Sequence, residues 1–131
     1  MRVLIVHHNA DVASFWAMYF SRQDAGVQVA NNIDSAIKSL RFDAINVIIL
    51  DMALPNGQSF SISDYAGVFH PKVPIVAIST STFFSGTDLF EMMPNARALM
   101  AMPLQLSDLK AIVDFYATQV PDKVTKFRAA S

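Results

Sequence analysis

Five short apolar runs recur along the chain and are separated by polar or mixed segments. They cover Arg2–Val6 and residues 27–30, 44–50, 73–78 and 98–102. Nearly continuous apolar runs of this length, rich in valine and isoleucine, are typical of strands covered on both faces, as in a parallel sheet. Residues 27–30 alternate between apolar and polar positions instead, so we expect this strand at an edge of the sheet.

The segments between these runs carry apolar positions at helical spacing. Asn9 is suited to cap a helix that runs to about residue 22. The face of this helix expected to pack on the sheet contains Val12, Phe15, Trp16 and Tyr19. Further helices are expected near residues 33–40, 59–69, 87–93 and 106–116. Strands that alternate with helices predict right-handed crossovers and a doubly wound α/β fold.

The composition fits one well-buried domain. The chain has 131 residues, of which 53% are hydrophobic and 16% charged, whereas a typical domain has about 25% charged residues. We therefore expect extensive burial and some exposed apolar surface. A net charge of −1 gives no indication of nucleic-acid or anionic-membrane binding. The chain has no cysteine, which excludes disulfides and thiolate metal sites.

No targeting or membrane segment is evident in the sequence. The apolar start of the chain is too short for a signal peptide, and no apolar run approaches the roughly 20 residues that span a bilayer. We expect a cytoplasmic protein with one domain at residues 1–120 and a tail at 121–131. The tail is too short for a DNA-binding helix-turn-helix.

Polar side chains, together with Met102 and Pro103, stand at the carboxyl ends of the predicted strands. In doubly wound sheets, functional groups lie at these ends. In chain order these residues are His7, His8, Asn9, Asp51, Ser79, Thr80, Met102 and Pro103. We take this set as the candidate functional site.

Four segments in this order carry a resemblance to a known family: LIVHHN, VIILDMALPNG, VPIVAIS and MPL. Together they make residues 2–119 similar to the receiver domain of two-component response regulators, which has a flavodoxin-like fold. The resemblance implies five helices around a five-stranded parallel sheet of order 2-1-3-4-5. It also implies that Asp51 stands at the phosphoacceptor position, Ser79 at the switch hydroxyl and Pro103 in the Lys-Pro-Phe segment.

Several positions depart from the family pattern. The family's first strand ends in two acidic residues, where this chain has His7 and His8. The family's lysine is replaced by Met102. In the loop after the acceptor aspartate, Gly57 comes two positions earlier than the family glycine, and Ser59 stands at that spacing.

These departures change the expected chemistry. In the family, the acidic residues hold a magnesium ion that neutralises the phosphoryl oxygens, and the lysine contacts the phosphoryl group. Mg²⁺ prefers hard oxygen ligands and is seldom bound by imidazole, and the thioether of Met102 carries no charge. Loss of one charged stabiliser in phosphoryl transfer costs on the order of 10³-fold in rate. We therefore expect no functional Mg²⁺ site, no other cofactor, no enzymatic activity, and very slow or absent phosphorylation of Asp51.

Three interpretations of the histidines stay open. His7 and His8 fill the space of a lost metal ion and hydrogen-bond the backbone, or they form a pH-responsive pair with Asp51, or they belong to a transition-metal site. The third histidine, His70, is not at motif spacing from the other two.

Two apolar segments are candidate interfaces. Residues 83–102 are rich in methionine, phenylalanine and leucine and nearly free of charge, and Phe84, Phe90 and Leu99 are the candidates there. The resemblance places Leu99 at the family's aromatic switch position and this region at the surface that contacts partners. Trp16, in the apolar first helix, is a second candidate. Tight core packing explains the same pattern equally well.

The leading functional hypothesis is an atypical stand-alone receiver domain in phosphorelay-type signalling. It acts through contacts with other signalling proteins, such as a histidine kinase, or with a second copy of itself. One alternative is a single-domain regulator that still accepts phosphate on Asp51 by an unusual route. The other is a metal- or ligand-binding flavodoxin-like module.

Overall fold

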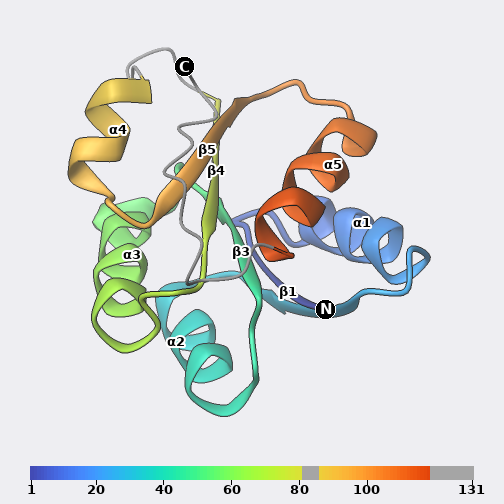
Figure 1. The fold of residues 1–131 in the computed structure, drawn as a ribbon, viewed down its shortest axis with the longest axis horizontal. Helices are drawn as coiled ribbons and strands as arrows, with labels where there is room; N and C mark the ends of the chain where they lie inside the picture. The colour runs from blue at the N-terminus through green and yellow to red at the C-terminus, as the bar shows by residue number, and fades with distance from the viewer. Residues whose placement is uncertain (81–85, 119–131) are drawn as a thin grey trace.

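In the computed structural model, which describes residues 1–80 and 86–118, a five-stranded parallel sheet lies between two layers of helices (Figure 1). The strands are β1 (Arg2–Val6), β2 (Gly26–Ala30), β3 (Val47–Asp51), β4 (Ile75–Ser79) and β5 (Ala96–Ala101). The helices are α1 (Ala10–Ser21), α2 (Ile33–Phe42), the 3₁₀ turn η1 (Pro55–Gly57), α3 (Gln58–Phe69), α4 (Gly86–Met92) and α5 (Leu106–Ala117). The strand order β2-β1-β3-β4-β5 confirms the predicted fold.

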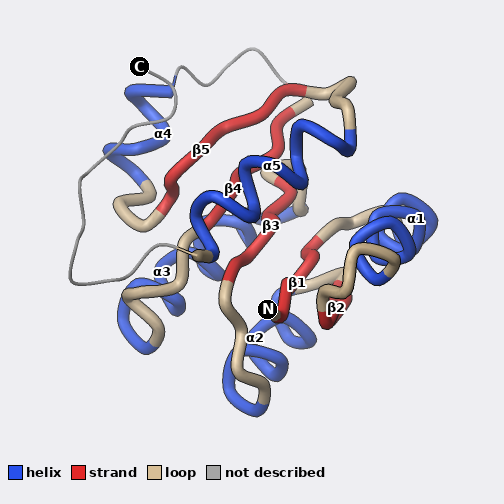
Figure 2. The backbone as a smooth tube through the Cα atoms, turned by 45° about the vertical axis from the view of Figure 1, so that its right-hand side comes forward, coloured by secondary structure: helices blue, strands red, loops and turns tan. Residues whose placement is uncertain are grey.

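Two apolar cores lie on the two faces of the sheet. Helices α1 and α5 cover one face, and α2, α3 and α4 cover the other (Figures 1 and 2). Side chains along a strand point alternately to opposite faces, so Val3 and Ile5 of β1 enter the core under α1 and α5. Leu4 and Val6 enter the core under α2 and α3. This two-sided burial explains why the strands are nearly continuous apolar runs.

Strand positions agree with the sequence predictions, except that three strands begin two or three residues from the predicted start. β4 begins at Ile75 rather than at residue 73. β3 begins at Val47 rather than at residue 44. Ala44 and Asn46 are exposed, and the Asn46 side chain accepts a hydrogen bond from the backbone N–H of Arg2 at 2.7 Å. β5 begins two residues earlier than predicted, at Ala96. The alternating segment forms β2, an outer strand as expected.

Asn9 caps α1 as predicted. Its side-chain oxygen accepts hydrogen bonds from the backbone N–H groups of Asp11 at 2.9 Å and Val12 at 3.2 Å. These bonds satisfy two of the donors that every helix start leaves unpaired. The cap fixes the direction in which the chain leaves β1, immediately after the two histidines. Among the described helices, none is long and apolar enough to cross a membrane.

The face of α1 that packs on the sheet agrees with the predicted one at Val12, Trp16 and Tyr19, but not at Phe15. Ala13, Trp16 and Phe20 are buried, whereas Phe15 is 63% exposed. Trp16, a candidate interface residue, is only 4% exposed, so that interpretation was wrong. The reason is that nearly every position from 12 to 20 is apolar, which leaves the phase of the helix undefined by the sequence.

Candidate functional site

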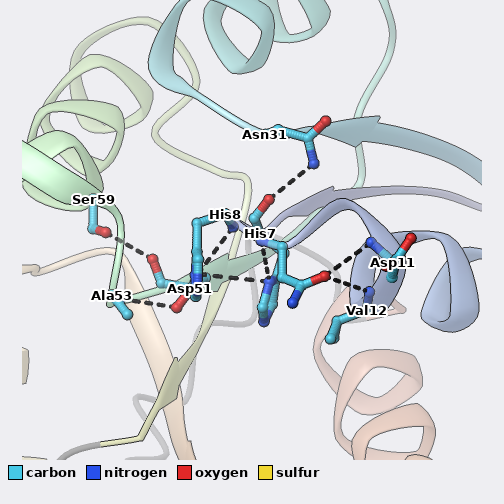
Figure 3. Close-up of polar contacts among 9 residues, drawn as sticks. His7, His8, Asp11, Val12, Asn31, Asp51, Ala53 and Ser59 are labelled. Atoms are coloured by element: carbon cyan, nitrogen blue, oxygen red, sulfur yellow. Dashed lines mark hydrogen bonds and ion pairs between the residues drawn. The ribbon is translucent and has the colours of Figure 1, made fainter.

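The carboxyl ends of β1, β3 and β4 lie at one edge of the sheet and carry predicted site residues. Figure 3 shows His7, His8 and Asp51 there. His7 and His8 directly follow β1, Asp51 is the last residue of β3, and Ser79 is the last residue of β4. Asp51 pairs in register with Ile78, so Ser79 lies one residue beyond the level of Asp51 at the same edge of the sheet.

Both carboxylate oxygens of Asp51 accept hydrogen bonds. Asp51 is 2% exposed. Its Oδ2 accepts the backbone N–H of His8 at 3.1 Å and contacts Nδ1 of the same histidine at 2.5 Å. Its Oδ1 accepts the backbone N–H of Ala53 at 2.8 Å. Hydrogen bonds to an ionised carboxylate are among the strongest in proteins, so His8 holds the carboxylate on the side facing β1.

The environment of Asp51 favours its ionised form. Burial alone would raise the pKa of the Asp51 carboxyl, but the hydrogen bonds from the His8 side chain, from Ala53 and from the His8 backbone outweigh it, and the nearby His7 acts in the same direction. The pKa of Asp51 therefore lies below its ordinary value. A buried carboxylate at this position is charged and already held by hydrogen bonds from its protein neighbours.

His7 is buried and held on several sides. It is 7% exposed, and its Nδ1 accepts the backbone N–H of Asn9 at 3.0 Å. Its carbonyl oxygen accepts the side-chain amide of Asn31 at 3.0 Å. The ring stacks on His8 with centroids 5.0 Å apart and meets the edge of Trp16 at 5.2 Å. Trp16 therefore contributes to the site from inside the core rather than from the surface.

The contacts of His7 favour a neutral imidazole. An Nδ1 that accepts a hydrogen bond has a free lone pair, so the ring proton sits on Nε2. Burial lowers the pKa of His7 more than the opposite charge of Asp51 raises it. The two histidines thus differ: His7 is a buried neutral ring, while the His8 side chain is 48% exposed and contacts the carboxylate directly.

Ser59 connects the start of α3 to the end of β3. Its buried hydroxyl donates a hydrogen bond to the backbone carbonyl of Asp51 at 2.7 Å. The preceding loop turns through left-handed backbone conformations at Asn56 (φ 58°) and Gly57 (φ 70°), the second of which suits glycine. The serine that replaces the family glycine at this spacing therefore anchors the loop beside Asp51.

The end of β5 offers an apolar group where the family has an ammonium. The backbone N–H of Met102 donates to the carbonyl of Ser79 at 2.9 Å, which places Met102 beside the end of β4. Met102 is half-buried and packs against the core under α1 and α5, and it precedes exposed Pro103 through a cis peptide bond. Among the described residues, the imidazoles of His7 and His8 have their Nδ1 atoms 3.7 Å and 2.5 Å from Oδ2 of Asp51.

The predicted interface residues fall into three situations. Phe90 and Leu99 are half-buried and pack against the core under α2 and α3. Phe84 lies outside the described residues, and Trp16 is buried as described above. The exposed apolar side chains of the first and last helices are instead Phe15, Met18 and Phe115.

Two site residues had not been singled out from the sequence. Asn31 directly follows β2 and donates to His7, and Ala53 donates its backbone N–H to Asp51. The rule that polar residues at carboxyl ends of strands gather at one edge was sufficient to find Asn31. No sequence signal indicates the backbone bond of Ala53, because its partner is set by the path of the loop.

The site does not fit the magnesium ion that the receiver resemblance implies. One ligand atom from each of His7, His8 and Asp51 lies within 4.8 Å of the others. Two of these three donors are imidazoles, whereas Mg²⁺ needs near-octahedral oxygen ligands. The arrangement can orient a buried carboxylate, and it offers two imidazole nitrogens and one carboxylate oxygen as ligands.

Solved structures with this architecture include receiver domains of response regulators. The Francisella response regulator 1452 receiver domain matches with a TM-score of 0.77 and 16% identity, over 88% of this chain and 95% of the other. A CheY-like response regulator receiver domain protein from Methanospirillum hungatei matches with a TM-score of 0.76 and 17% identity, over 88% and 94%. The chain has the receiver-domain fold. Response regulator protein TrrA from Thermotoga maritima, solved in complex with Mg²⁺ and BeF, has the same fold with a TM-score of 0.77 and 16% identity, over 88% and 97%.

Sequence comparison agrees with the receiver fold. Response regulator protein PilR of Pseudomonas aeruginosa is 24% identical over 112 residues, which are 86% of this chain and 25% of PilR. The chain thus spans about a quarter of the length of this curated relative. No protein-family model matches the sequence.

Proposed function

We propose that this chain is a receiver module of two-component signalling that works through contacts with other signalling proteins, without a magnesium-dependent phosphoryl cycle on Asp51. The receiver fold and the likeness to the response regulator PilR support the signalling role. Partners of this kind include a histidine kinase, and a second copy of the chain is a further candidate. We propose no catalytic activity of this module on other molecules.

The contact between His8 and Asp51 carries this proposal. An acceptor carboxylate must present a free oxygen to the phosphoryl donor, yet Oδ2 is held by His8 and Oδ1 by Ala53. TrrA shows Mg²⁺ and BeF bound to a protein of this fold, but the donors at the corresponding edge here are imidazoles. Without that ion, the charge that builds up in phosphoryl transfer has no strong counterion.

Neither neighbouring position replaces the missing charge. His7 is buried with a lowered pKa, so it is neutral near pH 7, and Met102 offers only a thioether. The donors to Asp51 stand where a phosphoryl group and its cation would otherwise act. We infer that they fix the loop after β3 in one conformation, so the surfaces of the module are presented without a covalent signal.

Phosphorylation with a small donor tests this proposal. Tag-free protein is incubated with acetyl phosphate and MgCl₂, and intact mass is followed over time with Asp51→Asn as the specificity control. We expect no phosphoryl mass gain in the wild-type chain. A triple variant, His7→Asp, His8→Asp and Met102→Lys, restores the family's charged groups and is expected to acquire the modification. A rapid mass gain in the wild type that Asp51→Asn abolishes contradicts the proposal.

A further inference from the structure

We propose that His7, His8 and Asp51 together bind one borderline divalent transition-metal ion, for which Zn²⁺ is the reference. This inference rests on the loss of the magnesium site in the proposed function, but it does not depend on any signalling partner. The sequence left a transition-metal site as one of three open interpretations of the histidines. The geometry of the side chains now favours it for three separate reasons.

The first reason is distance. Zinc–nitrogen and zinc–oxygen bonds are about 2.0–2.2 Å in a tetrahedral site, which puts neighbouring ligand atoms about 3.3–3.5 Å apart. Nδ1 of His7 lies 3.7 Å from Oδ2 of Asp51, already close to this spacing. Nδ1 of His8 lies 2.5 Å from the same oxygen and must move outward by about 0.9 Å. The half-exposed His8 side chain has the space to do so.

The second reason is the chemistry of the donors. Imidazole nitrogen suits Zn²⁺, Ni²⁺ and Cu²⁺, and affinities for such a site rise along the Irving–Williams series to copper. Two neutral imidazoles and one carboxylate reduce the charge of a divalent ion to +1. To bind through Nδ1, His8 places its proton on Nε2 instead of sharing it with Asp51. His7 Nδ1 already has a lone pair and exchanges the hydrogen bond from Asn9 for the ion.

The third reason is the support around the ligands. Ala53 binds Oδ1 of Asp51, which leaves Oδ2 as the oxygen that faces both histidines. Trp16 packs edge-on against the His7 ring, and Asn31 fixes the His7 backbone carbonyl. Such second contacts orient ligands and commonly change metal affinity by about 10–100-fold. The His7 and Asp51 ligands are therefore held in place by their neighbours. The half-exposed His8 side chain leaves a path by which the ion enters and a fourth coordination position for water.

Competition titrations with zinc test the proposed site. Tag-free wild type, His8→Gln, Asp51→Asn and His70→Gln are each titrated with Zn²⁺ against a chromogenic chelator. His70 is the matched control because it lies at the far end of α3, a helix about 18 Å long that starts at the site. We expect one zinc equivalent in wild type and His70→Gln, and an affinity loss of at least about tenfold in the other two variants. Equal affinity in all four proteins, or no binding by the wild type, overturns the inference.

A second readout needs only the wild-type protein, so it does not depend on folding of the variants. Two-bond ¹⁵N–¹H spectra of the imidazoles are recorded with and without Zn²⁺. We expect the Nδ1 signals of His7 and His8 to shift with one equivalent while those of His70 stay in place. Shifts confined to His70 contradict the site. If zinc does not bind and Asp51 is not phosphorylated, the metal site is contradicted but the proposed function is not. If Asp51 is phosphorylated in a magnesium-dependent reaction, the proposed function is contradicted, whether or not zinc binds.

Discussion

Nδ1 of His8 lies 2.5 Å from Oδ2 of Asp51, although 43 residues separate the two positions in the sequence. The same oxygen also accepts the backbone N–H of His8 at 3.1 Å. One residue at the end of β1 thus holds the carboxylate at the end of β3 through both its backbone and its side chain.

Replacing His8 by alanine is expected to raise the pKa of Asp51, because the carboxylate loses its side-chain donor and keeps only backbone donors. A carboxyl whose folded pKa lies below the unfolded value of about 3.9 contributes stability above that pH and loses it as the pH falls through the folded pKa. The variant should therefore unfold in acid at a higher pH than the wild type. A ¹³C carboxyl titration of Asp51 measures the shift directly. An unchanged Asp51 pKa would show that the His8 side chain is not its partner in solution.

Asp51→Asn is expected to destabilise the fold by about 1–3 kcal/mol at pH 7, the usual cost of breaking hydrogen bonds to a buried charged group. In a pocket of several carboxylates, the same change would relieve repulsion between like charges and stabilise the protein. Urea unfolding at pH 7, in the presence of a metal chelator, separates the two cases. A variant more stable than the wild type contradicts the geometry described here.

The stability of the metal-free protein should fall as the pH is lowered below about 6.5, the unfolded pKa of histidine. The pKa of His7 is lowered by burial, so the unfolded chain takes up a proton in this range before the folded chain does. His7→Gln removes this contribution, and its unfolding free energy should change less between pH 7 and pH 5.5. Urea unfolding with chelator at several pH values makes the comparison. Identical pH dependence in both proteins contradicts a buried neutral His7.

Trp16 and Phe15 form a matched pair on α1 that tests which face is buried. Trp16→Ala should cost about 3–5 kcal/mol, the range for removing a buried aromatic side chain. Phe15 is 63% exposed, so Phe15→Ala should change stability by less than about 1 kcal/mol. Chemical unfolding of both variants is followed by circular dichroism. Tryptophan fluorescence does not serve for this comparison, because Trp16 is the one tryptophan of the chain. A larger loss for Phe15→Ala would reverse the assignment.

The fold could be predicted from the sequence because the parallel sheet is buried on both faces. Each strand reads as a short apolar run, and Asn9 and the prolines mark where helices begin or end. The phase of α1 could be predicted only in part, because Trp16 is buried as expected and Phe15 is not. Apolar side chains occupy both of its faces, so whether Trp16 or Phe15 is buried depends on tertiary packing.

The candidate site could be located from the sequence but not assembled. Placing His7, His8 and Asp51 at carboxyl ends of strands required only the element order. The choice of His8 rather than His7 as the direct partner of Asp51 depends on ring orientations fixed by Trp16 and Asn9, which no local pattern encodes. These ring orientations also explain why the His7 side chain is buried while the adjacent His8 side chain is half-exposed.

Titration with MgCl₂ and beryllofluoride tests the central claim most directly, namely that the donors around Asp51 have replaced the ion and the phosphoryl group. Backbone ¹⁵N–¹H spectra of the tag-free chain report on His8, Asp51, Ala53 and Ser79 without any need for a slow chemical step. We predict no saturable shifts at these residues when both reagents are present. Saturable shifts centred on Asp51, which require magnesium and disappear in Asp51→Asn, would contradict the account.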